Sequence, residues 1–443
     1  LFNSLGAPIG ALMVTLGFAV DRGRSKLEVA KRDSGIPESQ KNLFAKCFPW
    51  VVLVLVAVSF LLTSRVPETA GNAPDYAAFG SLPLVYEGRV KPFDTVARNS
   101  LRILSNRTTF TVIVPDSDEL PTKAENANDN DKLLKGQPAT RWLLDLIADP
   151  AAVAKHRVFR IDHPQLIEKL KLEKRKTHLY ALEEFADQIM TLMADSDQAR
   201  RKDDGKRNAD DRAVLELERR LGLFDLLSKT FTPSNITAES WQKDLQRTMT
   251  ELQALDNREP PLSVPPVKSS GKEDVNASEV WEPFARGWAK SWVAANLMQQ
   301  EGSEPVTLFT EILVAHSTHE PSEFNSKVAE YQRWLERNTP KDLDVKKVHF
   351  EAYYNSFAPC FWSAIAYLFA FLLSLFALLG WQRPLNKAAF LTILLTFLLH
   401  SFALGARVYI SGRPPVTNLY SSAVFIGWGC VLLGLVFEFV FRV

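Results

Sequence analysis

The sequence predicts an α-helical polytopic membrane protein with a large extracytoplasmic domain that is mainly α-helical, with some β-strands. Long uncharged apolar runs lie toward both ends of the 443-residue chain, and its middle is charged and polar. An apolar run of about 20 residues is long enough to cross a hydrocarbon core of about 30 Å. Basic residues stand beside these runs at positions that assign one consistent orientation to all of them.

Two apolar runs precede the polar middle. Residues 1–20 carry no charge and are predicted to form a first span, made irregular by Pro8; a buried or clipped segment is the alternative. Residues 47–64 are rich in Val and Leu and form a cleaner span. Between the two, residues 21–46 form a basic loop that the positive-inside rule assigns to the cytoplasm. The chain is therefore expected to reach the outer face at about residue 65.

Residues 65–356 are predicted to form the extracytoplasmic domain. A short strand at residues 82–86 is followed by a turn at Glu87-Gly88. Residues 108–114 predict a second strand, and the acidic residues 115–135 predict a mobile segment. Four prolines in residues 256–278 predict a linker. Helical periodicity is found at residues 179–196, 211–230, 279–300, 305–316, 321–338 and 343–355.

Residues 357–443 are predicted to begin a membrane module with three spans, at residues 357–380, 388–406 and 421–441. The loop between the first two carries Arg383 and Lys387 and is assigned to the cytoplasm. Residues 407–420 then lie on the outer side. We expect a multi-pass protein of the bacterial inner (cytoplasmic) membrane. The apolar run that ends the chain leads us to expect a longer polypeptide.

Composition argues against several classes of protein. The net charge is +1, with 52 basic and 51 acidic residues, so nothing favours a nucleic acid partner. The three cysteines, Cys47, Cys360 and Cys430, lie in or beside apolar runs, and without a Cys-x-x-Cys-His motif the chain is not itself a c-type cytochrome. His316 and His319 form the one pair at metal-like spacing, and we expect them to be two histidines at a helix end.

His400 is the histidine that lies inside an apolar run, and an ionisable residue in a span suggests a function. Arg407 follows seven residues later, about 10 Å along a helix and on the same face. A neutral imidazole can ligate iron, and a guanidinium can bind a carboxylate. Heme combines an apolar, iron-centred body with carboxylates at one edge. The alternative is that His400 hydrogen-bonds a neighbouring helix.

The connector after this run has a specific residue order, Ser-Gly-Arg-Pro-Pro-Val-Thr-Asn-Leu-Tyr-Ser-Ser at residues 411–422. It resembles the cytochrome c assembly family, in its CcsA/ResC-type form of system II cytochrome c biogenesis. The matching positions are Arg407, Pro415, Asn418, Leu419, Tyr420 and Ser422. The sequence departs from the family at Arg413, where the family often has His, and at Ser421, where it often has Glu. The family's Trp-rich outer loop is absent, as expected if the chain stops before it.

Residues 88–98, Gly-Arg-Val-Lys-Pro-Phe-Asp-Thr-Val-Ala-Arg, also resemble an extracytoplasmic region of some large members of this family. The resemblance implies heme as cofactor, with delivery of heme for covalent attachment to apocytochrome c. It implies that the protein works with apocytochrome c, with a ResB/CcsB-type membrane partner or fused domain, and with a thioredoxin-like thiol reductant. It leaves open whether the chain is part of a heme lyase of the holocytochrome c synthase type.

The site residues that follow from the resemblance are the proposed iron ligand and four further heme-binding residues: His400, Arg407, Arg413, Asn418 and Tyr420. No catalytic residue is assigned. Two other functions stay open. A membrane-anchored extracytoplasmic sensor or adaptor without heme would need no histidine two turns from an arginine. A transporter subunit would need broken helices or polar groups at the midplane of several spans.

Overall fold

The computed structural model describes residues 38–65, 73–114, 132–237, 240–267, 278–417 and 419–441. Contacts divide the chain into two compact units. The membrane unit combines residues 1–68 with residues 353–443, and the middle unit comprises residues 69–352. The predicted span at residues 1–20 and most of the predicted loop at 21–46 lie outside the described residues.

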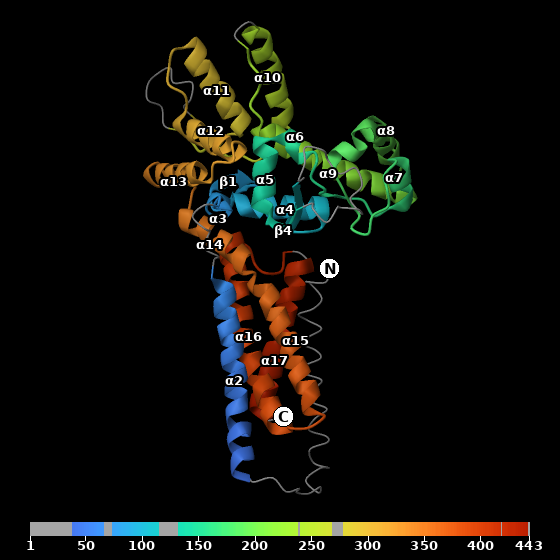
Figure 1. Cartoon of the computed structure of the whole chain (residues 1–443), viewed down its shortest axis with the longest axis vertical. Coiled ribbons are helices and arrows are strands. Elements are labelled where there is room, and N and C mark those ends of the chain that lie inside the picture. The colour runs from blue at the N-terminus through green and yellow to red at the C-terminus, as the bar shows by residue number, and fades with distance from the viewer. Residues whose placement is uncertain are drawn as a thin grey trace. The chain divides into compact units, whose positions relative to one another are not determined.

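The membrane unit is made of long apolar helices. Among the described residues, four segments are long and apolar enough to cross a membrane, so the chain is a membrane protein: Ala45–Ser64, Val345–Ala377, Gln382–Ser411 and Leu419–Phe441. They overlap the four predicted spans that lie in the described part of the chain. The helices are α2 (Glu38–Ser64), α15 (Pro359–Ala377), α16 (Gln382–Ser411) and α17 (Leu419–Phe441). They lie side by side in Figure 1, and α16 contacts the other three.

The ends of these helices follow from local residue chemistry. A break at Ala358, with φ of 50°, separates α14 (Val345–Phe357) from α15, and Pro359 has no N–H to continue the helix. Helix α16 is longer than the predicted span 388–406 and ends at Gly412, whose φ of 65° suits a helix C-cap. Helix α2 begins at Glu38, so the end of the predicted basic loop is helical.

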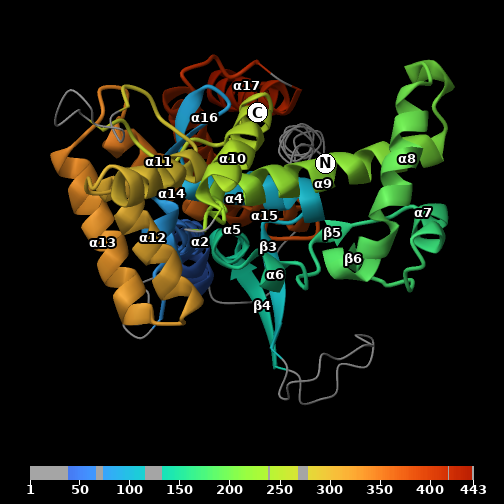
Figure 2. The ribbon, with the colours of Figure 1, turned by 90° about the horizontal axis from the view of Figure 1, so that it is seen from above.

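The middle unit is mainly α-helical and contains three two-stranded antiparallel sheets in its described residues. Figure 2 shows α9 as a long helix that crosses the unit, and it contacts α4, α5, α8, α10 and α11. The strands are β1 (Pro83–Tyr86), β2 (Arg89–Pro92), β3 (Thr109–Val114), β4 (Lys132–Pro138), β5 (Phe159–Arg160) and β6 (Leu179–Tyr180). The α-helices are α3 (Tyr76–Gly80), α4 (Phe93–Ser105), α5 (Ala139–Ala148), α6 (Pro150–Val153), α7 (Pro164–Lys169), α8 (Ile189–Arg200), α9 (Ala209–Phe231), α10 (Trp241–Asp256), α11 (Phe284–Leu297), α12 (Glu304–Ser317) and α13 (Pro321–Arg337). Two 3₁₀ helices are η1 (Leu182–Gln188) and η2 (Asp204–Lys206).

The first hairpin matches its prediction. Strands β1 and β2 are joined by Glu87 and Gly88, whose φ angles of 52° and 75° are both left-handed. Positive φ at both central residues is what a tight hairpin turn with the right twist requires. The hairpin places Arg89 and Lys91 directly before α4, where both side chains find acidic partners.

Three predictions in the middle unit are corrected by the structure. Strand β4 begins at Lys132 and pairs with β3, so the predicted mobile segment 115–135 ends in a strand. The predicted helix at 179–196 is instead divided into three elements: strand β6, the 3₁₀ helix η1 and the start of α8. The backbone departs from helical angles at Phe185, so no single helix covers the range. The predicted linker 256–278 is not a free spacer in its described part, residues 256–267 and 278. Its residues form β-bridges with distant segments, Val85 with Leu262 and Val264 with Glu282.

Aromatic side chains fill the centre of the middle unit. The ring of Phe309 on α12 lies 5.1 Å from Phe284, 5.8 Å from Phe93 and 6.0 Å from Tyr331. These four side chains are at most 2% exposed. Burying one such side chain contributes about 1.5–3 kcal/mol. The cluster therefore joins α4, α11, α12 and α13 in one core.

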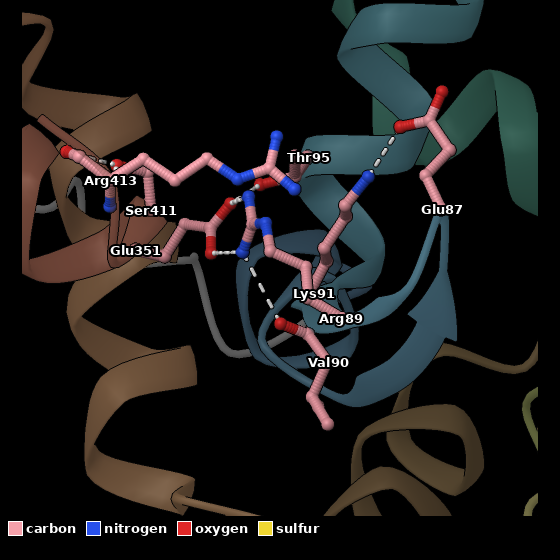
Figure 3. Close-up of polar contacts among 8 residues, drawn as sticks. All are labelled: Glu87, Arg89, Val90, Lys91, Thr95, Glu351, Ser411 and Arg413. Atoms are coloured by element: carbon pink, nitrogen blue, oxygen red, sulfur yellow. Dashed lines mark hydrogen bonds and ion pairs between the residues drawn. The ribbon is translucent and has the colours of Figure 1, made fainter. Parts of the chain in front are cut away.

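A buried carboxylate connects the hairpin to α14 (Figure 3). Glu351 is 4% exposed, and its two oxygens accept hydrogen bonds from Arg89 Nη1 at 2.6 Å and Arg89 Nη2 at 2.7 Å. Thr95 Oγ1 donates a third bond at 2.8 Å. Beside it, Lys91 Nζ pairs with Glu87 at 2.5 Å. A carboxylate with three donors in this arrangement fixes β2, α4 and α14 together.

We predict that Arg89→Ala destabilises the middle unit by about 3 kcal/mol, because it leaves the buried Glu351 charge without its partner. The measurement is chemical unfolding of the full-length protein in detergent, followed by tryptophan fluorescence. Arg333→Ala is the matched control, since Arg333 is exposed and, among the described residues, its side chain bonds the Ala329 carbonyl of its own helix. Equal stability of the two variants would contradict a stabilising role for the Glu351 pair.

Candidate functional site

His400 lies on the inner face of α16. It is 2% exposed and shares this face with buried Ile393, Thr396 and Leu404. Its Nδ1 lies 3.5 Å from the hydroxyl of Tyr367 on α15, and the two rings meet edge to face at 5.9 Å. The imidazole is also hydrogen-bonded to the backbone of Val424 on α17. The contact with neighbouring helices, the alternative considered from the sequence, is therefore present.

Arg407 lies two turns further along the same helix and is half-buried. Its guanidinium lies 4.9 Å from the ring centre of Tyr420, and Nη2 donates a hydrogen bond to Ser421 Oγ at 3.4 Å. No carboxylate in the described part of the chain forms an ion pair with it. A guanidinium has five N–H donors, so Arg407 keeps donors for an anionic ligand.

Two residues that the sequence did not single out surround Arg407. The Tyr354 hydroxyl on α14 donates to the Ala403 carbonyl at 3.2 Å and lies 3.4 Å from Cys360 Sγ. The Tyr354 hydroxyl and the Cys360 thiol are both close enough to the Arg407 guanidinium to interact with its charge. Tyr354 precedes the predicted span and belongs to no motif. Its position follows from packing between residues 49 apart in sequence.

The other predicted site residues differ in their surroundings. Tyr420 lies under Arg407, as described. Arg413 is exposed, and its backbone N–H bonds the Ser411 hydroxyl at 3.2 Å (Figure 3). Asn418 lies outside the described residues. The structure therefore brings Arg407 and Tyr420 into direct contact, whereas His400 lies deeper in the helix group.

The residues fit heme in their chemistry. An imidazole surrounded by apolar helices and a guanidinium without a carboxylate partner lie about 10 Å apart on one helix face. This separation matches a ligand with iron at its centre and carboxylates at its edge. The His400 ring is enclosed here, so binding iron requires the ring to give up its contact with Tyr367 or Val424. Arg407 needs no such change.

The two histidines of the predicted pair in the middle unit, His316 and His319, have separate protein partners. His316 Nε2 lies 2.7 Å from Asp145 Oδ1, and its ring meets Tyr76 edge to face at 6.0 Å. His319 is exposed, with Nδ1 2.9 Å from the Ser317 carbonyl. In the described ranges no three His, Cys, Asp or Glu residues are grouped so that they could hold a metal ion. Helix α12 ends at Ser317, so the pair stands at a helix end, as expected.

The chain matches no protein-family model and no curated protein. Its function therefore has to be inferred from the residues of the site and from the resemblance of residues 411–422.

His156 gives the middle unit a pH dependence. Burial lowers the pKa of His156, Asp145 opposes this and Arg141 adds to it. The unfolded chain then binds more protons at low pH than the folded chain, so stability falls as the pH drops below about 6.5. We predict that His156→Leu loses less stability than the wild type between pH 8 and pH 5. Unfolding titrations at both pH values test this, with pH 8 as the internal reference; equal losses would contradict it.

Proposed function

We propose that the protein binds heme in the membrane and delivers it for covalent attachment to apocytochrome c. The observation that carries the proposal is the placement of His400 and Arg407 on one face of α16. The imidazole lies among apolar helices, and the guanidinium has no carboxylate partner among the described residues. The resemblance of residues 411–422 to the cytochrome c assembly family supports the same function.

In this proposal each residue has a separate task. His400 ligates the iron through one ring nitrogen, and Arg407 binds a heme propionate. Tyr420 holds Arg407 in place through its ring. Arg413, directly after Gly412, is proposed to add a further polar contact, and Asn418 is proposed as a heme-binding residue from the resemblance alone. Bound heme supplies the vinyl groups that form thioether bonds with the partner's thiols.

The proposed setting is the bacterial inner membrane, with the middle unit on the outer side. Arg383 and Lys387 at the start of α16 favour the cytoplasm for that end of the helix. Apocytochrome c, a ResB/CcsB-type protein and a thioredoxin-like reductant are the proposed partners. Whether this chain takes part in heme lyase chemistry depends on those partners.

We predict that alkaline phosphatase fused after Thr232 is active and that the same enzyme fused after Arg383 is inactive, because the reporter folds only outside the cytoplasm. A green fluorescent protein fusion at each position is the control, with the opposite pattern expected. Phosphatase activity at Arg383 but not at Thr232 would reverse the proposed orientation.

The alternative is an adaptor without heme. The enclosure of His400, with its contacts to Tyr367 and Val424, is what such a protein would also need, because a polar ring buried among apolar helices must be partnered. The two functions differ in whether the protein takes up heme and whether uptake depends on Arg407.

We predict that the purified full-length protein binds heme and that Arg407→Ala weakens binding about 10- to 100-fold. A charge-assisted hydrogen bond contributes about 1.5–3 kcal/mol, and about 1.4 kcal/mol corresponds to tenfold. If His400 is the residue that would hold the iron, His400→Ala should shift the heme absorption spectrum through loss of that ligand. Arg383→Ala, at the opposite end of α16, is the matched control and should bind like the wild type.

The outcomes separate the hypotheses. A wild-type protein that takes up no heme would support the adaptor. Heme binding with an unchanged spectrum in His400→Ala would remove His400 as ligand. Equal affinity of Arg407→Ala and Arg383→Ala would remove Arg407 as the propionate partner.

A further inference from the structure

We propose that Tyr354 and Cys360 are further residues of the heme site and line the end at which Arg407 binds a carboxylate. Together with Arg407 and Tyr420 they form a cluster that we name the Arg407 corner. Nothing in the sequence pattern marks Tyr354 or Cys360 as ligand-binding. The inference rests on the proposed function. It extends the heme site to α14 and α15, the two helices that precede α16.

Tyr354 lies on the surface that the ligand would cover. Its hydroxyl bonds the carbonyl of Ala403 at 3.2 Å, and Ala403 stands between His400 and Arg407 on α16. Ala403 is three positions after His400 and four positions before Arg407, or about 4.5 Å and 6 Å along the helix axis. A planar ligand that reaches from the imidazole to the guanidinium therefore has to contact the Tyr354 phenol.

Cys360 lies at the side of this phenol. It stands in the first turn of α15, two residues after the break at Ala358, and its Sγ is 3.4 Å from the Tyr354 hydroxyl. The side chain is half-buried, so a small thiol reagent can reach it. The break at Ala358 means that Tyr354 and Cys360 belong to different helices. The Cys360 thiol is close enough to the Arg407 guanidinium for the two groups to interact electrostatically.

The residues of the Arg407 corner are suited to an apolar ligand that carries a carboxylate group. Arg407 offers a planar set of donors that matches a carboxylate, and it is held by the face of Tyr420. The Tyr354 hydroxyl supplies a further polar contact, and the Cys360 thiol supplies a small, weakly polar wall. A carboxylate bound to Arg407 would cover the thiol, and a bulky group on the thiol would exclude the carboxylate.

The test is protection of Cys360 from a maleimide. In the 443-residue chain, Cys47→Ser and Cys430→Ser leave Cys360 as the single thiol, and a further variant that adds Cys360→Ser gives the background. The ligands are hemin, iron-free protoporphyrin IX and hemin dimethyl ester, which has no free carboxylate. At about ten times the dissociation constant, hemin and protoporphyrin IX should slow labelling about tenfold by mass action. The dimethyl ester should slow it far less, and Arg407→Ala should reduce the protection by hemin to about twofold or less at the same hemin concentration.

Tyr354→Phe gives a second measurement that does not use the thiol. It keeps the ring and removes the hydroxyl, so we expect weaker binding of hemin with unchanged binding of the dimethyl ester. Heme binding seen by absorption while Cys360 reacts at its unprotected rate would overturn the inference and leave the proposed function standing. Equal protection by hemin and its dimethyl ester would also overturn it. No heme binding by absorption would overturn both.

Discussion

The membrane unit depends on how α16 satisfies the polar side chains that it places among apolar helices. An unpartnered polar group in such surroundings costs several kcal/mol. Thr396 solves this within the helix, since its hydroxyl bonds the Thr392 carbonyl at 2.7 Å. His400 contacts neighbouring helices. Ser401 does both, since its hydroxyl donates to the Phe397 carbonyl at 2.8 Å and accepts a 2.8 Å bond from Trp428 Nε1 on α17. Their partners fix which faces of α15 and α17 meet α16.

The middle unit contains a corresponding set of ion pairs in or beside its core, each with at least one member in residues 88–98. Arg89 binds Glu351, and Arg98 Nε bonds both oxygens of Asp94 at 2.7 and 2.8 Å. Thr140 adds a bond to Asp94 at 3.3 Å. The polar residues of this segment therefore have partners inside the unit. These contacts give the segment a structural role that requires no ligand.

Much of the fold could be predicted because its signals are local. Hydropathy located four helices, and the Glu87-Gly88 pair located the first hairpin. The helical repeat placed His400 and Arg407 on one face. Long-range pairing had no such signal: Glu351 lies 262 residues from Arg89, and nothing near either residue identifies the other.

The candidate site divides in the same way. Arg407 and Tyr420 came from one connector, where residue order alone was informative. Tyr354 and Cys360 reach Arg407 only because a left-handed residue and a proline break the chain between α14 and α15. The enclosure of His400 likewise depends on α15 and α17, whose packing no pattern in α16 specifies.

The contacts of His400 and Arg407 imply an order of events in the proposed function. Arg407 is half-buried and is held by a ring and one long hydrogen bond, so a carboxylate can bind it without repacking. His400, in contrast, has to give up its contacts with Tyr367 or Val424 before it can bind iron. Its bond to Tyr367 is 3.5 Å long, at the weak limit for a hydrogen bond, and an edge-to-face ring pair contributes about 0.5–1.5 kcal/mol. A ligand held at the Arg407 corner stays close to His400 while α15 or α17 yields, so the second contact forms at high effective concentration. Carboxylate recognition by Arg407 should therefore precede iron ligation by His400. Tyr354 contacts α16 at Ala403, between these two residues.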